Sequence, residues 1–356
     1  DYSGFGYKTS VENDVLVTRC PLFVPDKPTA LKRIFHLASF AFSSALALIP
    51  KLFSSKTRPD VLFVVQPTLF ITPIALLFAK LAGAKTVLHI QDYEVDAMFG
   101  LGLASDGSFL SRIAYGVETW LMRRFDVVST ISFSMMEKAK QKGVNVAKML
   151  FFPNWADTDF VTPDVDGSVL RNKWGLSDSD QVILYAGNLG AKQGLEMVLE
   201  AAAKYQEDSR YQTVKFVFVG AGAHIDSLKQ QAAELQLANV IFKPLQAWED
   251  VPAMLSMADI HLVIQKKGAA DAVLPSKLTN ILSAGGYSVV TAETDTELGK
   301  IAVKYPGIYT LAEPENLDAF ITALDVELGR LEKGVTAYNA IARLYAEKNL
   351  NKDAIL

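Results

Sequence analysis

Short runs of β-branched and aromatic residues alternate along the chain with amphipathic stretches of helical period. The runs with strand character are 60–65, 85–90, 126–131, 147–152, 181–186, 214–219, 239–242, 259–264 and 287–291. Runs of this length and composition are typical of strands buried on both faces, and helices between them are typical of parallel sheets. We therefore predict an α/β fold built on doubly wound parallel sheets.

One segment interrupts this alternation and indicates a boundary between domains. Residues 153–180 are rich in turn-forming residues, namely Pro153, Pro163, Asp164, Gly167 and Gly175. We predict an N-terminal domain over 1–163, a C-terminal domain over 164–335 and a final helix over 336–356.

Two apolar segments have some of the character of membrane spans. Residues 34–49 carry no charge, but they are short for a span of about 20 residues and include His36 and three serines. We expect an interfacial helix or a buried one there. Residues 61–79 are longer, but Pro67 and Pro73 divide them, so we predict a strand, a loop and a helix.

The composition limits the class of protein. The chain has 356 residues, of which 50% are hydrophobic and 21% charged, so it is long enough for two domains and is not a disordered, collagenous or small disulfide-stabilised protein. The net charge of −4 gives no indication of nucleic-acid binding, and we expect no nucleic-acid partner. A single cysteine, Cys20, fits a reducing compartment.

The charge is uneven along the chain. Residues 1–150 carry a net charge of +5 and the remaining residues −9, which together give the −4 of the whole. Residues 27–90 hold eight basic side chains and one acidic side chain, Asp60, within a strongly apolar sequence. This combination suits an anionic membrane surface.

Polar and glycine-rich residues follow several of the predicted strands. The segments are 89–94, 153–157, 187–190, 220–222 and 265–271. Ligands of open parallel sheets bind beyond the carboxyl ends of the strands, because helix N-termini and loops converge there. Two such edges facing each other across a cleft would suit a large, jointed, anionic substrate.

Each of these segments also has a plainer explanation. Gly187–Gly194 is either an ordinary strand-to-helix turn or a phosphate loop in which glycine N–H groups approach a diphosphate and Lys192 adds charge, and we favour the phosphate loop. Gly220 and Gly222 fit a tight turn equally well, since the third glycine of a dinucleotide fingerprint is missing. His89 ends a buried strand, where a hydrogen-bonded core histidine is usual, but the polar residues after it favour a functional role.

The sequence shows no transition-metal cage. Its four histidines and one cysteine are dispersed. Asp157–Asp159 and Asp178–Asp180 imitate an Asp-x-Asp metal motif, but their surroundings indicate a helix cap or linker and a turn before a strand. We expect neither a metal ion nor another cofactor.

An ordered set of motifs carries a resemblance to a known family. The motifs are Asn154-x-x-Asp157-x-x-Phe160, Gly187-Asn188-x-x-x-Lys192-Gln193-Gly194, Gly220-x-Gly222 after a strand, Ala258-Asp259 before a strand, and Pro275-Ser276-Lys277-x-x-Asn280-x-x-Ser283-Ala284-Gly285. Each is unspecific alone. Together they extend over nearly the whole chain and resemble glycosyltransferase family 4, whose GT-B fold has two Rossmann-like domains facing a cleft.

The resemblance implies a retaining transfer of a sugar from a nucleotide-diphosphate donor to a polyprenyl-diphosphate-linked saccharide in exopolysaccharide biosynthesis. GDP-fucose is the single donor that it favours, for a pathway of the colanic acid type. Its implied catalytic residues are His89, Asp92, Glu94 and Asp271. Its implied donor-binding residues are Gly187, Asn188, Lys192, Gln193, Gly220, Gly222, Gln246, Gly268, Ala269, Ser276, Lys277 and Asn280. A helix N-terminus and lysine side chains would stabilise the leaving diphosphate without a metal.

The chain departs from the family pattern at several positions. Two glutamates eight residues apart are common in the family, and here those positions are Ala272 and Asn280, with Asp271 beside the first. The usual arginine and lysine of the diphosphate loop are Asn188 and Gln193.

The ends of the chain also differ from the family pattern. A glycine-rich first strand-turn-helix has no counterpart before residue 60, where only residues 13–19 have clear strand character. We therefore expect an incomplete N-terminal domain and a truncated C-terminal helix.

Two other functions remain open. A nucleotide-sugar epimerase of the same fold would need no acceptor, and a non-catalytic sugar-nucleotide binder of an assembly complex would account for Ala272 and Asn280. For the transferase, the basic and apolar residues 27–56 would hold a cytoplasmic protein on the inner face of the plasma membrane. A helix buried between the domains explains the same apolar run equally well.

Overall fold

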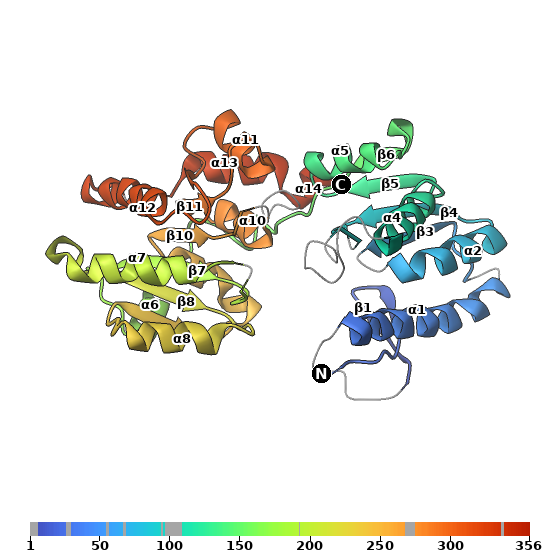
Figure 1. Cartoon of the computed structure of the whole chain (residues 1–356), viewed down its shortest axis with the longest axis horizontal. Coiled ribbons are helices and arrows are strands. Elements are labelled where there is room, and N and C mark those ends of the chain that lie inside the picture. Colours follow the sequence, from blue (N-terminus) through green and yellow to red (C-terminus); the bar gives the residue numbers. More distant parts are fainter. Residues whose placement is uncertain are drawn as a thin grey trace. The chain divides into compact units, whose positions relative to one another are not determined.

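The structure is a computed structural model with two separate units. It describes residues 6–25, 30–54, 57–66, 69–93, 95–96, 109–191, 193–267, 275–335 and 338–356. The chain divides into an N-terminal unit, Asp1–Phe152, and a C-terminal unit, Pro153–Leu356 (Figure 1). This division lies before the expected one at 163/164, because Ala156 and Val161 are buried in the core of the C-terminal unit.

The N-terminal unit is built on a parallel sheet. Its strands are β3 (Val61–Gln66), β4 (Lys85–Ile90), β5 (Val127–Thr130) and β6 (Met149–Phe151), which pair in that order. Its helical elements are α1 (Ala30–Leu52), η1 (Leu69–Ile71), α2 (Thr72–Ala82), α4 (Phe109–Met122), α5 (Phe133–Gln141) and η2 (Val146–Lys148). The expected strand and helix over 61–79 are confirmed as β3 and α2. Between them, residues 69–71 form η1, and residues 67–68 lie outside the described residues.

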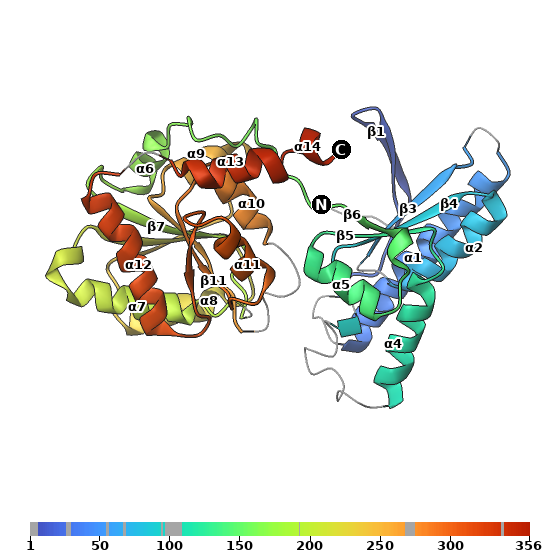
Figure 2. The same cartoon turned by 90° about the horizontal axis from the view of Figure 1, so that it is seen from above.

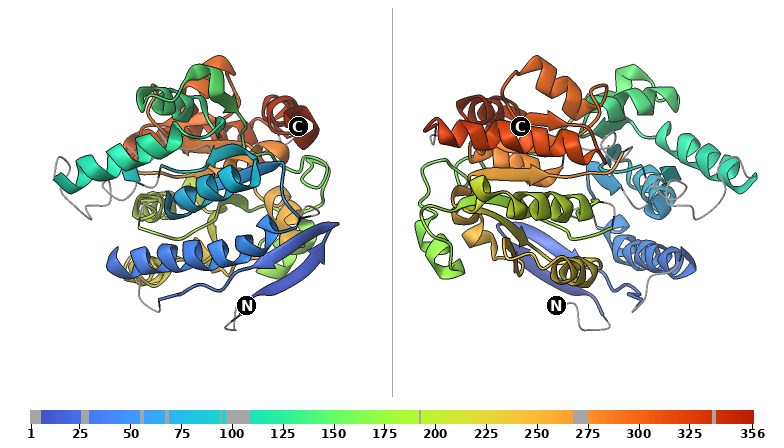
Figure 3. Two further views of the ribbon diagram at one scale, coloured as in Figure 1. Left: turned by 90° about the vertical axis from the view of Figure 1, so that its right-hand side faces the viewer. Right: turned by 60° about the vertical axis from the view of Figure 1, so that its left-hand side comes forward.

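A separate antiparallel hairpin precedes this sheet (Figure 3). It consists of β1 (Lys8–Glu12) and β2 (Val15–Arg19). Asn13 and Asp14 form its turn with φ values of 49° and 64°, and these residue types tolerate positive φ in two-residue hairpin loops. The strand expected over about 13–19 is confirmed as β2, except that its first two residues form this turn, and its partner β1 was not predicted.

Helix α1 is longer than its apolar sequence suggested. Within the described residues, Ile34–Leu52 is long and apolar enough to cross a membrane by length and composition, and 17% of its apolar window is buried. The side chains exposed on it include Phe35, Phe42 and Ile49. Helix α1 therefore buries only a few of its residues, among them Ala41, Ser43 and Ser44, within its own unit.

The C-terminal unit holds a larger parallel sheet (Figure 2). Within the described residues the order is β12-β11-β10-β7-β8-β9. The bounds are β7 (Gln181–Ala186), β8 (Val214–Val219), β9 (Val240–Lys243), β10 (Ile260–Val263), β11 (Ser288–Thr291) and β12 (Thr310–Ala312). Every run predicted as a strand contains or overlaps an observed strand, whereas β12 has three residues and was not predicted.

Helices cover both faces of this sheet. One face packs against α7 (Glu196–Glu207), α8 (Ile225–Glu234) and α12 (Leu317–Glu332). The other packs against α6 (Ser168–Trp174), α9 (Val251–Ser256), α10 (Ser276–Ser283), α11 (Glu297–Lys304) and α13 (Ala340–Asn349). The remaining elements are η3 (Ser209–Tyr211), η4 (Trp248–Asp250) and α14 (Lys352–Ile355). The strands are buried on both sides, as their continuous hydrophobic runs predict.

Candidate functional site

Two glycine turns lie side by side where the adjacent strands β7 and β8 end. Gly187 follows β7 with φ 150°, and Gly220 follows β8 with φ 144°. A Cβ added at Gly220 would lie 1.9 Å from the carbonyl oxygen of Gly187. Only glycine fits at Gly220, because both the backbone conformation and the neighbouring backbone exclude a side chain.

The same two turns meet again a few residues further on. A Cβ at Gly222 would lie 2.2 Å from the carbonyl oxygen of Leu189. The N–H groups of Gly187 and Leu189 donate to the carbonyls of Val219 and Ala221. These two N–H groups therefore hold the turns together and are not available to a phosphate.

The side chain of Tyr185, on β7, holds the turn that follows this strand. The hydroxyl of Tyr185 donates to the carbonyl of Asn188 at 2.8 Å, and the side chain of Asn188 is itself exposed. In the described part of the chain, the N–H groups of Asn188 and Gly190 have no partner. Of the residues of this turn, Gly187 lines the pocket described below.

The amine of Lys277 lies over this turn. A Cβ at Gly187 would lie 3.3 Å from Lys277 Nζ, and Nζ is 3.9 Å from the centre of the Tyr185 ring. Burial lowers the pKa of Lys277 to about 7. No carboxylate among the described residues pairs with it. An ammonium in this position favours an incoming anion, because the anion supplies the missing counter-charge.

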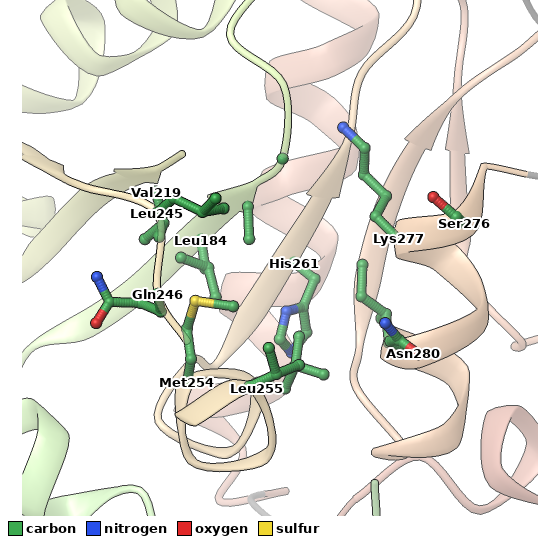
Figure 4. Close-up of a pocket in the computed structure, with 14 residues that line it drawn as sticks. Leu184, Val219, Leu245, Gln246, Met254, Leu255, His261, Ser276, Lys277 and Asn280 are labelled. Carbon is green, nitrogen blue, oxygen red and sulfur yellow. The ribbon is translucent and has the colours of Figure 1, made fainter. Parts of the chain in front are cut away.

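A pocket of about 210 Å³ opens beside Lys277 (Figure 4). Five of the predicted donor-binding residues line it: Gly187, Gln246, Ser276, Lys277 and Asn280. The remaining lining is apolar except for His261, and consists of Leu184, Ala186, Val219, Leu245, Val251, Met254, Leu255 and Ile281. The pocket therefore has a charged end at Lys277 and an apolar wall, an arrangement that fits an anionic ligand with a flat apolar part.

A second lysine contacts the glycine loop. A Cβ at Gly194 would lie 3.1 Å from Lys266 Cγ, so the Lys266 side chain passes over the loop. Gln193 belongs to the same loop, and its buried Oε1 has no hydrogen-bond partner among the described residues. Lys266 was not predicted as a site residue, since its place depends on how β10 is positioned beside β7.

In the N-terminal unit, His89 is a buried residue at the end of β4. Its Nδ1 lies 2.9 Å from Ser129 Oγ, and its Nε2 lies 2.8 Å from Gln91 Nε2. Because an amide nitrogen only donates, Nε2 accepts and Nδ1–H donates to Ser129. Burial lowers the pKa of His89, so the imidazole is neutral, and it stacks on Phe63 with ring centroids 5.6 Å apart.

The predicted catalytic roles in this unit stay predictions. Both ring nitrogens of His89 are engaged inside the unit, and Asp92 is half-buried. Glu94, Lys192, Gly268, Ala269 and Asp271 lie outside the described residues. Over the described ranges, no group of three or more His, Cys, Asp or Glu side chains could hold a metal ion.

Two α/β units of the Rossmann type, the second with paired glycine turns and a lysine at the carboxyl edge of its sheet, define the chain as a glycosyltransferase of the GT-B fold. It belongs to the family 4 glycosyltransferases. The family model "Glycosyl transferases group 1" matches residues 168–325, and the model "Glycosyl transferase 4-like domain" matches residues 2–155.

The chain is similar over its whole length to a bacterial glycosyltransferase. The chain is 46% identical over 360 residues to the putative colanic acid biosynthesis glycosyl transferase WcaI of Escherichia coli K12, with 100% of this chain and 85% of the relative covered. It is therefore a glycosyltransferase similar to WcaI.

Solved structures show the same fold at low identity. Anabaena HepE in complex with UDP has a TM-score of 0.69 at 17% identity, covering 92% of this chain and 82% of HepE. Sucrose-phosphate synthase from Thermosynechococcus elongatus has a TM-score of 0.75 at 15% identity, covering 100% and 84%. The predicted GT-B fold is confirmed.

Proposed function

We propose that the pocket in the C-terminal unit binds the nucleotide diphosphate of a sugar donor. The diphosphate lies at Lys277 and the turn Gly187–Gly190, and the nucleoside lies along the apolar wall. The observation that carries this proposal is the half-buried amine of Lys277, which lies over Gly187 and has no carboxylate partner among the described residues. The UDP bound to HepE, a protein of the same fold, supports it.

Asn280 is proposed to contact the ribose. It lies on α10 one turn after Lys277 and lines the same pocket. Its amide both donates and accepts a hydrogen bond, which suits a hydroxyl group. Asn280 thus takes the position that a glutamate commonly holds in the family.

The proposed reaction transfers the sugar with retention to a polyprenyl-diphosphate-linked saccharide in exopolysaccharide biosynthesis. As the bond to the donor diphosphate breaks, negative charge accumulates on its oxygens. Lys277 and the free N–H groups of the turn stabilise that charge, so the proposal includes no metal ion. GDP-fucose is the first donor to test, since the relative is named for colanic acid biosynthesis.

A transfer assay tests the proposed reaction. The protein is incubated with a panel of nucleotide sugars, with and without a polyprenyl-diphosphate-linked saccharide and with and without EDTA. We expect nucleotide diphosphate to be released only when the acceptor is present, equally with EDTA, and NMR of the product to show the anomeric configuration of the donor. Conversion of the donor without an acceptor would instead support an epimerase.

Helix α1 is proposed to hold the protein on the inner face of the plasma membrane. Phe35, Phe42 and Ile49 are exposed on one side of it, at spacings of seven residues, and Lys32 and Lys51 lie near its two ends. Aromatic and basic side chains together bind anionic lipid surfaces.

Vesicle sedimentation tests the membrane proposal. Binding to vesicles of phosphatidylcholine and phosphatidylglycerol is expected to fall strongly in the double variant Phe35→Glu/Phe42→Glu. Leu344→Glu, at an exposed position of α13, is the matched control and should bind as the wild type does. Equal binding of the double variant and the wild type would exclude α1 as the anchor.

A further inference from the structure

His261 is a buried imidazole that lines the donor pocket and has a nitrogen without a partner. It lies on β10, between β7 and β11, and its side chain is 1% exposed. Its Nδ1 makes no hydrogen bond to any described residue. Leaving a buried polar atom unpaired costs stability, so such an atom is a candidate for binding a ligand.

The imidazole is neutral. Burial lowers the pKa of His261 to about 4. A neutral imidazole has one N–H donor and one acceptor nitrogen. It therefore suits a neutral polar group and not a phosphate, for which Lys277 is already in place.

The ring is also held in one position. A Cβ at Gly286 would lie 2.5 Å from His261 Cδ2 and 2.7 Å from Nε2. The Cδ2–Nε2 edge therefore packs against the backbone of Gly286, while Ile281 of α10 lines the pocket beside it.

The surroundings of His261 indicate which part of a nucleotide it meets. Figure 4 shows the imidazole beside Leu255 and Met254, on the apolar side of the pocket and away from the ammonium of Lys277. A nucleobase is flat and largely apolar, with polar atoms on its edge, and fits such a wall.

We propose that His261 is a specificity-determining residue that hydrogen-bonds the polar edge of the donor nucleobase. The inference rests on the proposed function of the pocket. A site built to pair with a polar atom rejects ligands that lack it, because its own polar group is then left unpaired. Bases differ in which edge atoms donate and accept, so one fixed imidazole distinguishes among them.

Isothermal titration of UDP, CDP, GDP, ADP and inorganic pyrophosphate tests the inference. His261→Phe keeps a ring of similar size without a hydrogen bond, and His261→Gln restores a polar group. Ser288→Ala is the control. Ser288 lies on β11 directly opposite His261 of β10, and its buried hydroxyl also has no hydrogen-bond partner among the described residues. Unlike His261, Ser288 does not line the pocket.

In His261→Phe, the affinity for the preferred nucleotide is expected to fall roughly threefold to tenfold. The ratio of this affinity to the affinity for each of the other nucleotides is expected to fall by the same factor. The affinity for pyrophosphate should not change. His261→Gln should retain part of the preference, and Ser288→Ala all of it. Each comparison is a ratio between ligands for one protein, so partial loss of folded protein does not imitate it.

Several results would overturn the inference. Unchanged nucleotide affinity in His261→Phe would do so, and an equal loss for all four nucleotides would place the contact on the ribose or the phosphates. A wild-type protein that is folded but binds none of the nucleotides would refute the proposed function, and this inference with it. A protein that binds nucleotides without any effect of His261 would refute the inference alone.

Discussion

Replacing Lys277 by methionine should stabilise the protein and weaken its binding of a nucleotide diphosphate. Burial moves the pKa of Lys277 from 10.5 to about 7, and at about 1.4 kcal/mol per pH unit this corresponds to about 5 kcal/mol as an upper bound. Water and neighbouring atoms rearrange around a buried ion. We therefore expect a measured gain of roughly 1–2 kcal/mol for Lys277→Met, the common range for a stabilising substitution.

The pH dependence of this gain has a definite sign. Between pH 7 and 10.5 the unfolded chain binds a proton at Lys277 that the folded chain does not, so the stability of the wild type rises with pH across this window. The cost of the buried ammonium is complete below pH 7 and vanishes above pH 10.5. Lys277→Met should therefore gain most at pH 6.5 and little at pH 10.

Urea denaturation at both pH values measures the gain, and calorimetric titration with a nucleotide diphosphate measures the loss of function. Losing a charge-assisted contact of about 1.5–3 kcal/mol should weaken binding by roughly tenfold or more. In the wild type at pH 8, binding should take up protons, seen as a heat that depends on the buffer. A variant that is less stable at pH 6.5, or that takes up protons as the wild type does, would refute the reasoning.

Three further substitutions test other parts of the structure. Gly220→Ala should lower the free energy of unfolding by about 3 kcal/mol or more in urea denaturation, because its Cβ would meet a backbone oxygen at positive φ. Gly329→Ala in α12 is the control, since a Cβ there has nothing within 4 Å, and it should raise the free energy of unfolding by about 1 kcal/mol. Similar values for the two variants would contradict the close approach at Gly220. Lys142→Met should cost about 3–5 kcal/mol in thermal denaturation, since it leaves the buried carboxylate of Glu118 uncompensated, and an unchanged melting temperature would contradict this. Asn280→Ala should weaken nucleotide diphosphate binding roughly threefold to tenfold in calorimetry without changing the binding of pyrophosphate, and an equal loss for both would argue against a ribose contact.

The strands of both sheets could be predicted because each forms a continuous run of apolar and β-branched residues, and the central strands of the C-terminal sheet are also buried on both faces. The predictions failed where local sequence was ambiguous. β12 has three residues and depends on pairing with β11. The turn at Asn13–Asp14 lies inside a run that alternates like a strand.

The candidate site was partly predictable for a similar reason. Gly187, Gly220 and Lys277 occur in motifs whose chemistry is visible in the sequence. His261 becomes a candidate site residue only through the register of β10 against its neighbours, which brings together side chains far apart in the chain. Lys266 lies in the segment 265–271 that was expected at the edge of the sheet, but the sequence assigned it no role of its own. A histidine within an apolar strand has no local signal that separates a core residue from a ligand-binding one.

Each described residue of the pocket comes from the same unit, between Leu184 and Ile281. Under the proposed function, the choice of nucleotide is encoded in one continuous half of the chain. Exchanging residues 153–356 with the matching half of a relative should carry donor preference into the hybrid enzyme.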